Sequence, residues 1–155
     1  MVPNMVTRTD FNRYMMPTYK PANFIPSKAK GSLVWDKKNK KYIDFASGIA
    51  VSNLGHCHPI LNKALVEQSK KIWHLSNLLV NEPAMRLAKI FCKHTFAEKV
   101  FFANSGAEAV EGAIKTARKH AYENISKNKN EIVSFSDAFH GRTMMAIALN
   151  GSDRF

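Results

Sequence analysis

Two short stretches of the sequence hold the residue types that could do chemistry. The first, NSGAE at residues 104–108, follows four apolar residues and opens a helical pattern that extends to about Glu123. A strand that turns sharply into a helix presents the helix's first unpaired N–H groups at the positive end of the helix dipole. Such a turn can bind an anion, most often phosphate, and Gly106 lets the backbone approach that anion closely. Many helices simply begin after a Ser-Gly turn, so this motif alone leaves a purely structural role open.

The second stretch is SDAFHGRT at residues 136–143, directly after the apolar residues 132–135. It offers an aromatic ring (Phe139), an imidazole (His140) and a guanidinium (Arg142). A planar cofactor that carries a phosphate, with an anionic substrate beside it, would use these groups together with the N–H donors of the first stretch. The residues alone leave the alternative open, in which Phe139 is a core residue, His140 caps a turn and Arg142 pairs with a surface acid.

A strand, a helix and a second strand are expected to position these two stretches. Residues 100–103 and 132–135 are predicted to be short buried strands, because the first is a run of apolar residues and the second is apolar except for Ser134. The helix between them buries a face of Val110, Ala113, Ile114, Ala117 and Ala121. Strand, helix and strand at this spacing form a βαβ unit, which implies a parallel sheet. Ligands of open α/β sheets bind at the carboxyl ends of the strands, so both stretches are expected at one crevice.

The rest of the chain is expected to form an arm, a hairpin and two further helices. Residues 1 to about 30 are predicted irregular, since Pro3, Pro17, Pro21 and Pro26 exclude a long helix, and their aromatic residues suit an arm packed along something larger. Segments 32–36 and 41–45 are predicted to pair as a β-hairpin around a Lys/Asn turn. The helices are predicted to begin near Pro59 and at Asn81-Glu82-Pro83.

Composition limits the class of protein. The 155 residues fit one ordinary domain, and an apolar fraction of 45% is enough for a core. The net charge of +11 raises the question of nucleic acid. However, the cations are dispersed, the densest run lies in the predicted hairpin turn, and no zinc-finger, RRM or helix-turn-helix signature is present, so a nucleic-acid-binding module is only a remote alternative. The sequence shows no secretory leader and no apolar run of membrane-spanning length, which predicts a cytoplasmic protein.

A His-Cys-His cluster at residues 56–58 could be interpreted as a metal site, with Cys92 and His94 as further candidate ligands. Ligands at consecutive positions converge poorly on one ion, and the cluster lacks the spacing of structural zinc sites. We therefore predict no metal site, and interpret the cluster as turn residues ahead of a helix. Cys92 is predicted to be a core residue, and two cysteines do not make a disulfide framework.

The combined motifs resemble those of the fold-type I, class III aminotransferases, which use pyridoxal 5'-phosphate. NSGAEAVEGAIKTAR followed by FHGRT carries the resemblance, and LGHCHP, IWHLSN and NEPAMRLAKIF stand in the family's order and spacing over nearly the whole chain. Within the class, the acetylornithine branch is most similar. The resemblance implies an α/β fold, with residues 1–55 as the amino-terminal arm and β-hairpin of the small domain. Residues 56–155 would be helices and the first βαβ unit of the cofactor-binding large domain, whose sheet is mainly parallel.

The resemblance also implies a role for each matching residue. Gly106 and Ala107 match the backbone pair that holds the cofactor phosphate, and Ser105 lies in the same turn. Family members vary between Ala and Thr at position 107, and Ala keeps the N–H donor without a hydroxyl. Phe139 matches the aromatic residue stacked on the pyridine ring. Arg142 matches the residue that binds the substrate's α-carboxylate, a role that suits the rigid fork of a guanidinium.

The implied reaction is transfer of the δ-amino group of N-acetylornithine to 2-oxoglutarate in arginine biosynthesis, with N-succinyl-diaminopimelate of lysine biosynthesis as a second substrate. Ornithine and 4-aminobutyrate aminotransferases share the phosphate turn and stay open as alternatives. The resemblance further implies a homodimer with its site near the subunit interface. The family's Schiff-base lysine lies beyond the matched region. We therefore expect an amino-terminal fragment without that catalytic residue, and an inactive truncated gene product is a further alternative.

Overall fold

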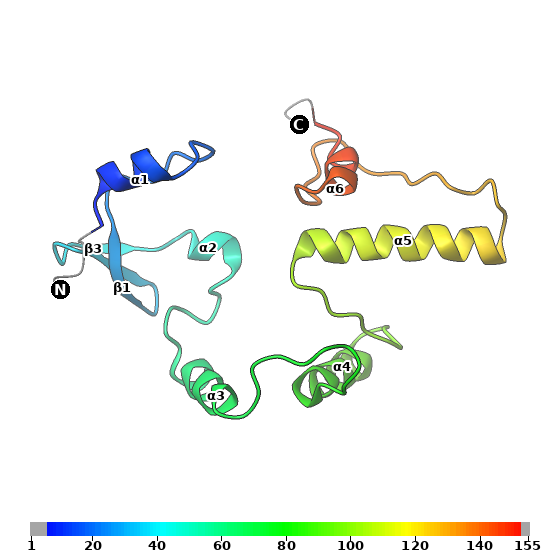
Figure 1. The fold of residues 1–155 in the computed structure, drawn as a ribbon, viewed down its shortest axis with the longest axis horizontal. Coiled ribbons are helices and arrows are strands. Elements are labelled where there is room, and N and C mark those ends of the chain that lie inside the picture. Colours follow the sequence, from blue (N-terminus) through cyan, green and yellow to red (C-terminus); the bar gives the residue numbers. More distant parts are fainter. Residues whose placement is uncertain (1–5, 153–155) are drawn as a thin grey trace. The chain divides into compact units, whose positions relative to one another are not determined.

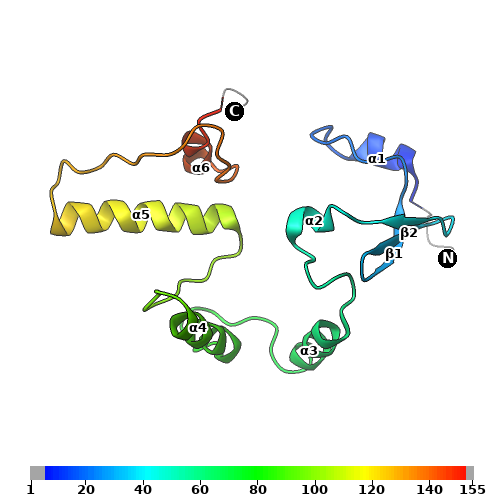
Figure 2. The same ribbon diagram turned by 180° about the vertical axis from the view of Figure 1, so that it is seen from behind.

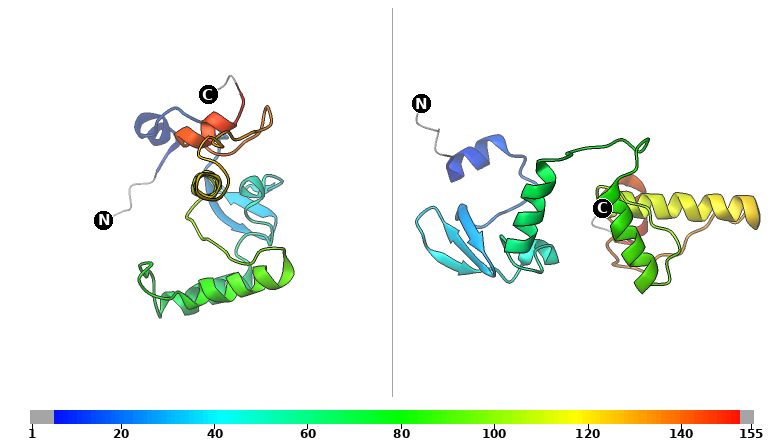
Figure 3. Two further views of the ribbon diagram at one scale, coloured as in Figure 1. Left: turned by 90° about the vertical axis from the view of Figure 1, so that its right-hand side faces the viewer. Right: turned by 90° about the horizontal axis from the view of Figure 1, so that it is seen from below.

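The computed structural model describes residues 6–152, which form parts of two units, Met1–Leu75 and Ser76–Phe155. Figures 1 and 2 show the elements from opposite sides, and Figure 3 gives two further views. The start of the predicted arm, with Pro3, lies outside the described residues. The domain boundary predicted between residues 55 and 56 stays a prediction.

The first unit contains a three-stranded antiparallel sheet in the order β1-β2-β3. Its strands are β1 (Pro26–Lys30), β2 (Leu33–Asp36) and β3 (Lys41–Ile43), with Val34 paired to both Ala29 and Tyr42. The predicted hairpin is thus confirmed as β2 and β3. β1 is absent from the sequence prediction because it lies in the proline-containing arm. Pro26 is tolerated there because it occupies the first position of an edge strand, where the sheet needs no N–H from it.

Asp36 organises the turn between β2 and β3. Its carboxylate, in a residue only 7% exposed, accepts hydrogen bonds from the N–H groups of Lys38 (2.8 Å) and Lys40 (2.9 Å) and from the Tyr42 hydroxyl (3.0 Å). Burial raises the pKa of the Asp36 carboxyl, but these hydrogen bonds outweigh burial and leave the pKa below its ordinary value. The Tyr42 ring stacks on Phe24 with centroids 4.2 Å apart, which ties the arm to the sheet.

Local signals, a proline in the first turn or a side-chain cap, mark the starts of the helices outside the candidate site. The predicted helix at Pro59 is confirmed, and so is the one at Asn81, whose side chain accepts from the N–H of Ala84 at 3.1 Å. The arm is less irregular than predicted, because a capping box between Thr7 and Asp10 starts a short helix ahead of the prolines. No helix within residues 6–152 is long and apolar enough to span a membrane. The three helices are α1 (Arg8–Tyr14), α3 (Pro59–Ser69) and α4 (Glu82–His94).

The second unit is organised around α5 (Gly106–Asn124), which confirms the predicted helix. The chain then runs back along α5 and ends in a short helix, α6 (Met144–Leu149), that packs against α5 (Figure 1). Ile114 of α5 and Ala146 of α6 are the buried apolar residues in the described part of the chain. The two helices that pack together thus contribute one buried apolar residue each.

The prediction of a buried strand on either side of α5 is wrong for this structure. Residues 100–103 and 132–135 form no ladder, and the described residues contain no parallel sheet. A strand exists only through hydrogen bonds to a neighbouring strand, and these two segments do not pair with each other. Instead, the Phe101 ring lies against α5 at Gly112, and Val133 and Phe135 are 95% and 86% exposed.

Candidate functional site

The start of α5 is held by the chain's own side chains. Ser105 is the N-cap residue, and its hydroxyl oxygen accepts a hydrogen bond from the N–H of Glu108 at 3.2 Å. The Glu108 carboxylate in turn accepts from the N–H of Asn104 at 2.7 Å. The N–H groups of Gly106 and Ala107, the first two of the helix, have no acceptor among the described residues. They are the unpaired donors that every helix start leaves over.

These two N–H groups suit an anion. Apart from the neighbouring residues and the backbone of α5 itself, no heavy atom lies within 4 Å of the point where a Cβ would stand on Gly106, so a ligand can approach the backbone there. The Ser105 hydroxyl already accepts one hydrogen bond and still has a proton to donate. The helix dipole adds a favourable field, whereas the Glu108 carboxylate at the same end opposes a second negative charge. The start of α5 therefore fits a phosphate group through two backbone donors and one hydroxyl.

The loop at residues 139–143 lies directly against this helix start. A Cβ added to Gly141, whose φ is +131°, would stand 2.8 Å from the Cβ of Ala107 and 3.1 Å from its Cα. Only glycine allows so close an approach at that φ. A second tie joins the Thr143 hydroxyl to a Glu111 carboxylate oxygen at 2.6 Å. The structure thus brings together the two stretches that the sequence predicts to meet.

Three side chains of this loop bear on ligand binding. Phe139 is 63% exposed, so the alternative that made it a core residue is wrong. The Arg142 guanidinium lies over the Phe139 ring, with Cζ 5.2 Å from the centroid, which is a cation–π contact on one face of the ring. The Nε2 of His140 is buried without a hydrogen-bond partner among the described residues. A buried polar atom left unpaired is costly, so this nitrogen fits a site that a ligand or water completes.

A second polar cluster lies in the first unit, and sequence analysis missed it. Asp44 accepts the N–H groups of Ala46 (3.0 Å) and Ser47 (2.9 Å) on one carboxylate oxygen, and its other oxygen lies 2.7 Å from Nε2 of His56. We call this group the Asp44 clamp. The hydrogen bond to His56, followed by that from Ser47, lowers the pKa of the Asp44 carboxyl. The available signal was an Asp at a strand end just before small residues, the pattern of an Asx turn.

The Asp44 clamp holds a segment with unusual backbone geometry. The four residues of α2 (Ser47–Ala50) all have φ between 49° and 65°, which makes α2 a left-handed turn. Three of them are not glycine, and such residues cost about 1–2 kcal/mol each in this conformation. The carboxylate hydrogen bonds offset part of that cost.

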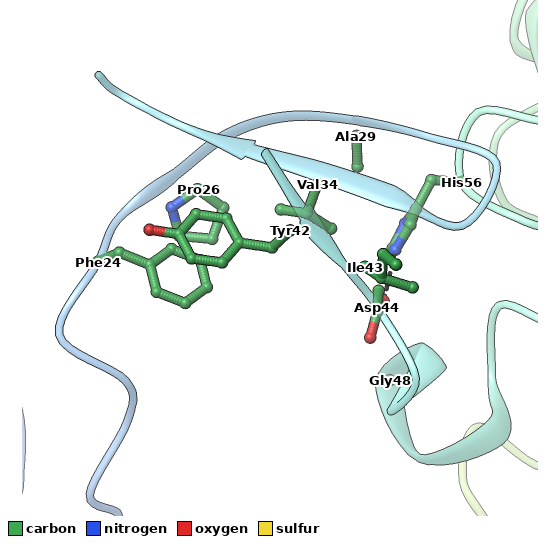
Figure 4. Close-up of a pocket in the computed structure, with 9 residues that line it drawn as sticks. All are labelled: Phe24, Pro26, Ala29, Val34, Tyr42, Ile43, Asp44, Gly48 and His56. Carbon is green, nitrogen blue, oxygen red and sulfur yellow. Dashed lines mark hydrogen bonds and ion pairs between the residues drawn. The ribbon is translucent and has the colours of Figure 1, made fainter. Parts of the chain in front are cut away.

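A cavity of about 410 Å³ lies beside the sheet, and its lining residues are drawn in Figure 4. The stacked rings of Phe24 and Tyr42 lie at one end of the cavity, and the Asp44–His56 pair lies at the other. Within residues 6–152, no three His, Cys, Asp or Glu side chains are grouped to hold a metal ion. Cys57 is exposed, and Cys92, predicted to be a core residue, is half-buried.

Comparison with known proteins decides the family. The family model for class III aminotransferases matches residues 14–154. This chain belongs to that family. It is 53% identical over 151 residues to the acetylornithine/succinyldiaminopimelate aminotransferase of Buchnera aphidicola subsp. Schizaphis graminum, a match that covers 97% of this chain and 37% of the relative. It is also 53% identical over 146 residues to the acetylornithine aminotransferase of Vibrio cholerae, with 94% and 36% covered. The chain therefore spans little more than a third of these relatives' length.

Solved structures agree with this assignment. The N-acetylornithine aminotransferase of Stenotrophomonas maltophilia superposes with a TM-score of 0.73 at 39% identity, covering 86% of this chain and 35% of that one. The ornithine aminotransferase of Toxoplasma gondii, a structure with partial occupancy of pyridoxal phosphate at its active site, gives a TM-score of 0.79 at 30% identity, with 89% and 33% covered. The predicted fold class, the α/β fold of fold-type I, is confirmed for this class III chain, although the parallel ladder is not formed within the described residues.

Proposed function

We propose that this class III chain forms the phosphate-binding and carboxylate-binding part of an N-acetylornithine aminotransferase. The enzyme would use pyridoxal 5'-phosphate and pass the amino group to 2-oxoglutarate in arginine biosynthesis. The observation that supports the proposal is the packing of Gly141 on Ala107, which brings the loop that contains Phe139 and Arg142 against the start of α5. The names of the Buchnera and Vibrio relatives support the choice of substrate.

Each residue of the site has a role that its chemistry suits. The N–H groups of Gly106 and Ala107 and the Ser105 hydroxyl donate hydrogen bonds to the cofactor phosphate. The face of Phe139 that Arg142 leaves uncovered stacks on the cofactor ring and excludes water from that side. The Arg142 fork binds the substrate's α-carboxylate with two parallel hydrogen bonds. When bound, pyridoxal phosphate supplies the electron sink that amino-group transfer needs.

The contact between Arg142 and Phe139 adds an orienting effect. Because the guanidinium lies against the aromatic ring, the group that would bind the substrate's carboxylate and the ring that would stack on the cofactor are held in one geometry. Holding two reactants in one geometry accounts for a large share of catalysis in many enzymes. The loop at residues 139–143 would thus set both the plane of the cofactor and the position of the substrate.

A second candidate substrate is N-succinylornithine. The chain is 53% identical over 150 residues to the succinylornithine transaminase of Photorhabdus laumondii, and equally to a Pseudomonas aeruginosa protein named for both activities. N-succinyl-diaminopimelate, named for the Buchnera relative, is a third. We further propose that the complete enzyme is a cytoplasmic homodimer, since the aromatic, proline-containing arm suits a segment that packs on a partner.

Titration of the complete protein with pyridoxal phosphate, followed by a competition assay, tests this function. Saturable cofactor binding and turnover of N-acetylornithine with 2-oxoglutarate are the expected results. Preference for N-succinylornithine would select the second candidate, whereas preference for 4-aminobutyrate or ornithine would overturn the choice of substrate. A protein that binds no pyridoxal phosphate would overturn the proposal itself.

Arg142→Lys tests the carboxylate-binding role. Lysine keeps the charge but loses the bidentate fork, so KM for N-acetylornithine should rise about 10-fold or more, the loss of one hydrogen bond to a charged group. Arg118→Lys makes the same change on the exposed face of α5 and should leave KM unchanged. Equal KM values for the two variants would assign the carboxylate to another residue.

A further inference from the structure

Asn150 is a fully buried polar residue next to the candidate site. Its exposure is 0%, and it is the largest side chain in the described residues that is completely buried. Its amide oxygen accepts a hydrogen bond from the N–H of His140 at 2.7 Å, and its amide nitrogen donates to the carbonyl of Gly141 at 3.1 Å. One partner can only donate and the other can only accept, so the orientation of the amide is determined. We call this group the Asn150 clamp.

The Asn150 clamp closes the loop that carries Phe139 and Arg142. Asn150 directly follows α6, and its own N–H donates to the carbonyl of Ile147 at 3.0 Å. The end of α6 is thereby bonded to a segment ten residues earlier in the chain. The next residue, Gly151, packs on Ser136, since an added Cβ would stand 3.2 Å from the Ser136 Cα. The loop is therefore fixed at its base as well as against α5.

We propose that Asn150 is a positioning residue for the cofactor and substrate contacts of the loop. It bonds to His140 and Gly141, the two residues that lie between Phe139 and Arg142. Holding these two peptide groups fixes the backbone that carries both functional side chains, in a loop that packs on the start of α5 through Gly141. The inference rests on the proposed function for the roles of Phe139 and Arg142.

An amide suits this position for a physical reason. The two backbone groups present one donor and one acceptor, and a neutral amide satisfies both without burying a charge. An ionised carboxylate would accept from His140 but repel the carbonyl of Gly141, and an apolar side chain would leave both groups unpaired at about 1–3 kcal/mol each. Among side chains of this length, the amide offers both functions without depending on pH.

Hydrogen exchange tests the clamp without any ligand. In Asn150→Ala, the amide of His140 should exchange about 10-fold faster, as expected for one lost hydrogen bond, while the central amides of α5 keep their protection. Asn124→Ala is the matched control, because Asn124 is exposed and its amide also donates to a backbone carbonyl, that of His120. Unchanged exchange at His140, or equal acceleration in the control, would overturn the clamp.

Asn150→Asp tests the positioning role through pH. A protonated aspartic acid can accept from His140 and donate to Gly141 as the amide does, and burial raises the pKa of such a carboxyl. Relative to the unsubstituted protein at each pH, Kd for pyridoxal phosphate and KM for N-acetylornithine should be about 10-fold higher at alkaline pH and recover as the pH falls. Faster exchange at His140 with unchanged Kd and KM would show a merely structural residue. If the unsubstituted protein binds no pyridoxal phosphate, the proposed function and the positioning role fail together, and the exchange experiment still decides the clamp.

Discussion

The Asp44 clamp and the Asn150 clamp solve the same problem with different chemistry. Each uses one side chain to bond two backbone groups of a loop that contains residues with positive φ. The Asp44 side chain is 19% exposed and lies beside His56, whereas Asn150 is completely buried. Asp44 only accepts hydrogen bonds from the backbone, and Asn150 both accepts and donates. The comparison shows how solvent access decides which side chain can hold a loop.

Burial explains the choice in each region. A carboxylate is tolerated at position 44 because water and His56 both stabilise its charge. A charge at position 150 would have neither, and an unpaired buried charge costs far more than a buried amide with both partners present. The loop in the first unit is therefore held by a carboxylate, which titrates, and the loop in the second unit by an amide, which does not.

The largest expected effect comes from crowding the loop that the Asn150 clamp holds. Gly141→Ala puts a methyl group 2.8 Å from Ala107 at a φ suited to glycine, so the free energy of unfolding should fall by about 3 kcal/mol. Gly48→Ala, in the loop that the Asp44 clamp holds, meets its nearest atom at 3.5 Å and should cost only about 1 kcal/mol. Urea unfolding, followed by amide exchange in each unit, measures both losses. Equal losses would mean that the two loops are equally open.

A smaller effect is expected from a substitution at the start of α5, against which the same loop packs. Ser105→Ala removes the N-cap hydroxyl but leaves the Asn150 clamp intact, and it should destabilise α5 by about 1 kcal/mol. Exchange should accelerate at Glu108, whose N–H loses its acceptor, and stay unchanged at His140. Ser126→Ala, which removes a hydroxyl from the loop after α5, is the control. Acceleration at His140 would show that the helix start, rather than Asn150, holds the loop.

The smallest effect is expected from acid, and it should distinguish the two clamps. The pKa of Asp44 is lowered in the folded state, so its stabilisation is present above the unfolded value of about 3.9 and is lost as the pH falls through the folded pKa. Trp35 and Trp73, the two tryptophans of the chain, both lie in the first unit, so tryptophan fluorescence below about pH 4 reports on that unit, in which the carboxyls of Asp10, Asp36 and Asp44 all have lowered pKa values.

The control for the acid titration is Asp44→Asn. This variant should be less stable at neutral pH and lose less stability in acid, with the contribution of Asp36, whose pKa is also lowered, remaining. Beyond its intrinsic pH dependence, exchange at His140 should respond less to acid in this range than the first unit does, because the Asn150 amide does not titrate and the carboxylate of Glu111 holds the loop only through Thr143. A response of the same size at both clamps would contradict the distinction between them.

The helices and the hairpin whose signals are local could be predicted from the sequence. Ser105 ahead of an apolar period predicts α5, and a Lys/Asn turn between two apolar segments predicts the β2–β3 hairpin, because a helix cap and a hairpin are both decided within a few residues. The meeting of residues 104–108 with the loop at residues 139–143 was also predicted, through a sheet argument whose strands the structure does not form.

Features that depend on a partner far along the chain could not be predicted from the sequence. Nothing near Asn150 indicates that it will bond to His140 and Gly141, and nothing near Asp44 indicates His56, twelve residues later. Residues 100–103 look like a strand by composition, but a strand needs a second backbone that the local pattern cannot supply. The roles of Ser105, Gly106, Ala107, Phe139 and Arg142 toward a ligand stay predictions.

The self-capped start of α5 has a consequence for the order of assembly. Ser105 and Glu108 satisfy the flanking groups of the helix from within the chain, so α5 can form before any anion arrives. The apoprotein then presents its donors already aligned, and loading the cofactor would not have to pay the entropy of winding a helix. Folding of α5 and binding of the cofactor would then be separate events, and the phosphate-binding helix start would already be formed in a newly made chain.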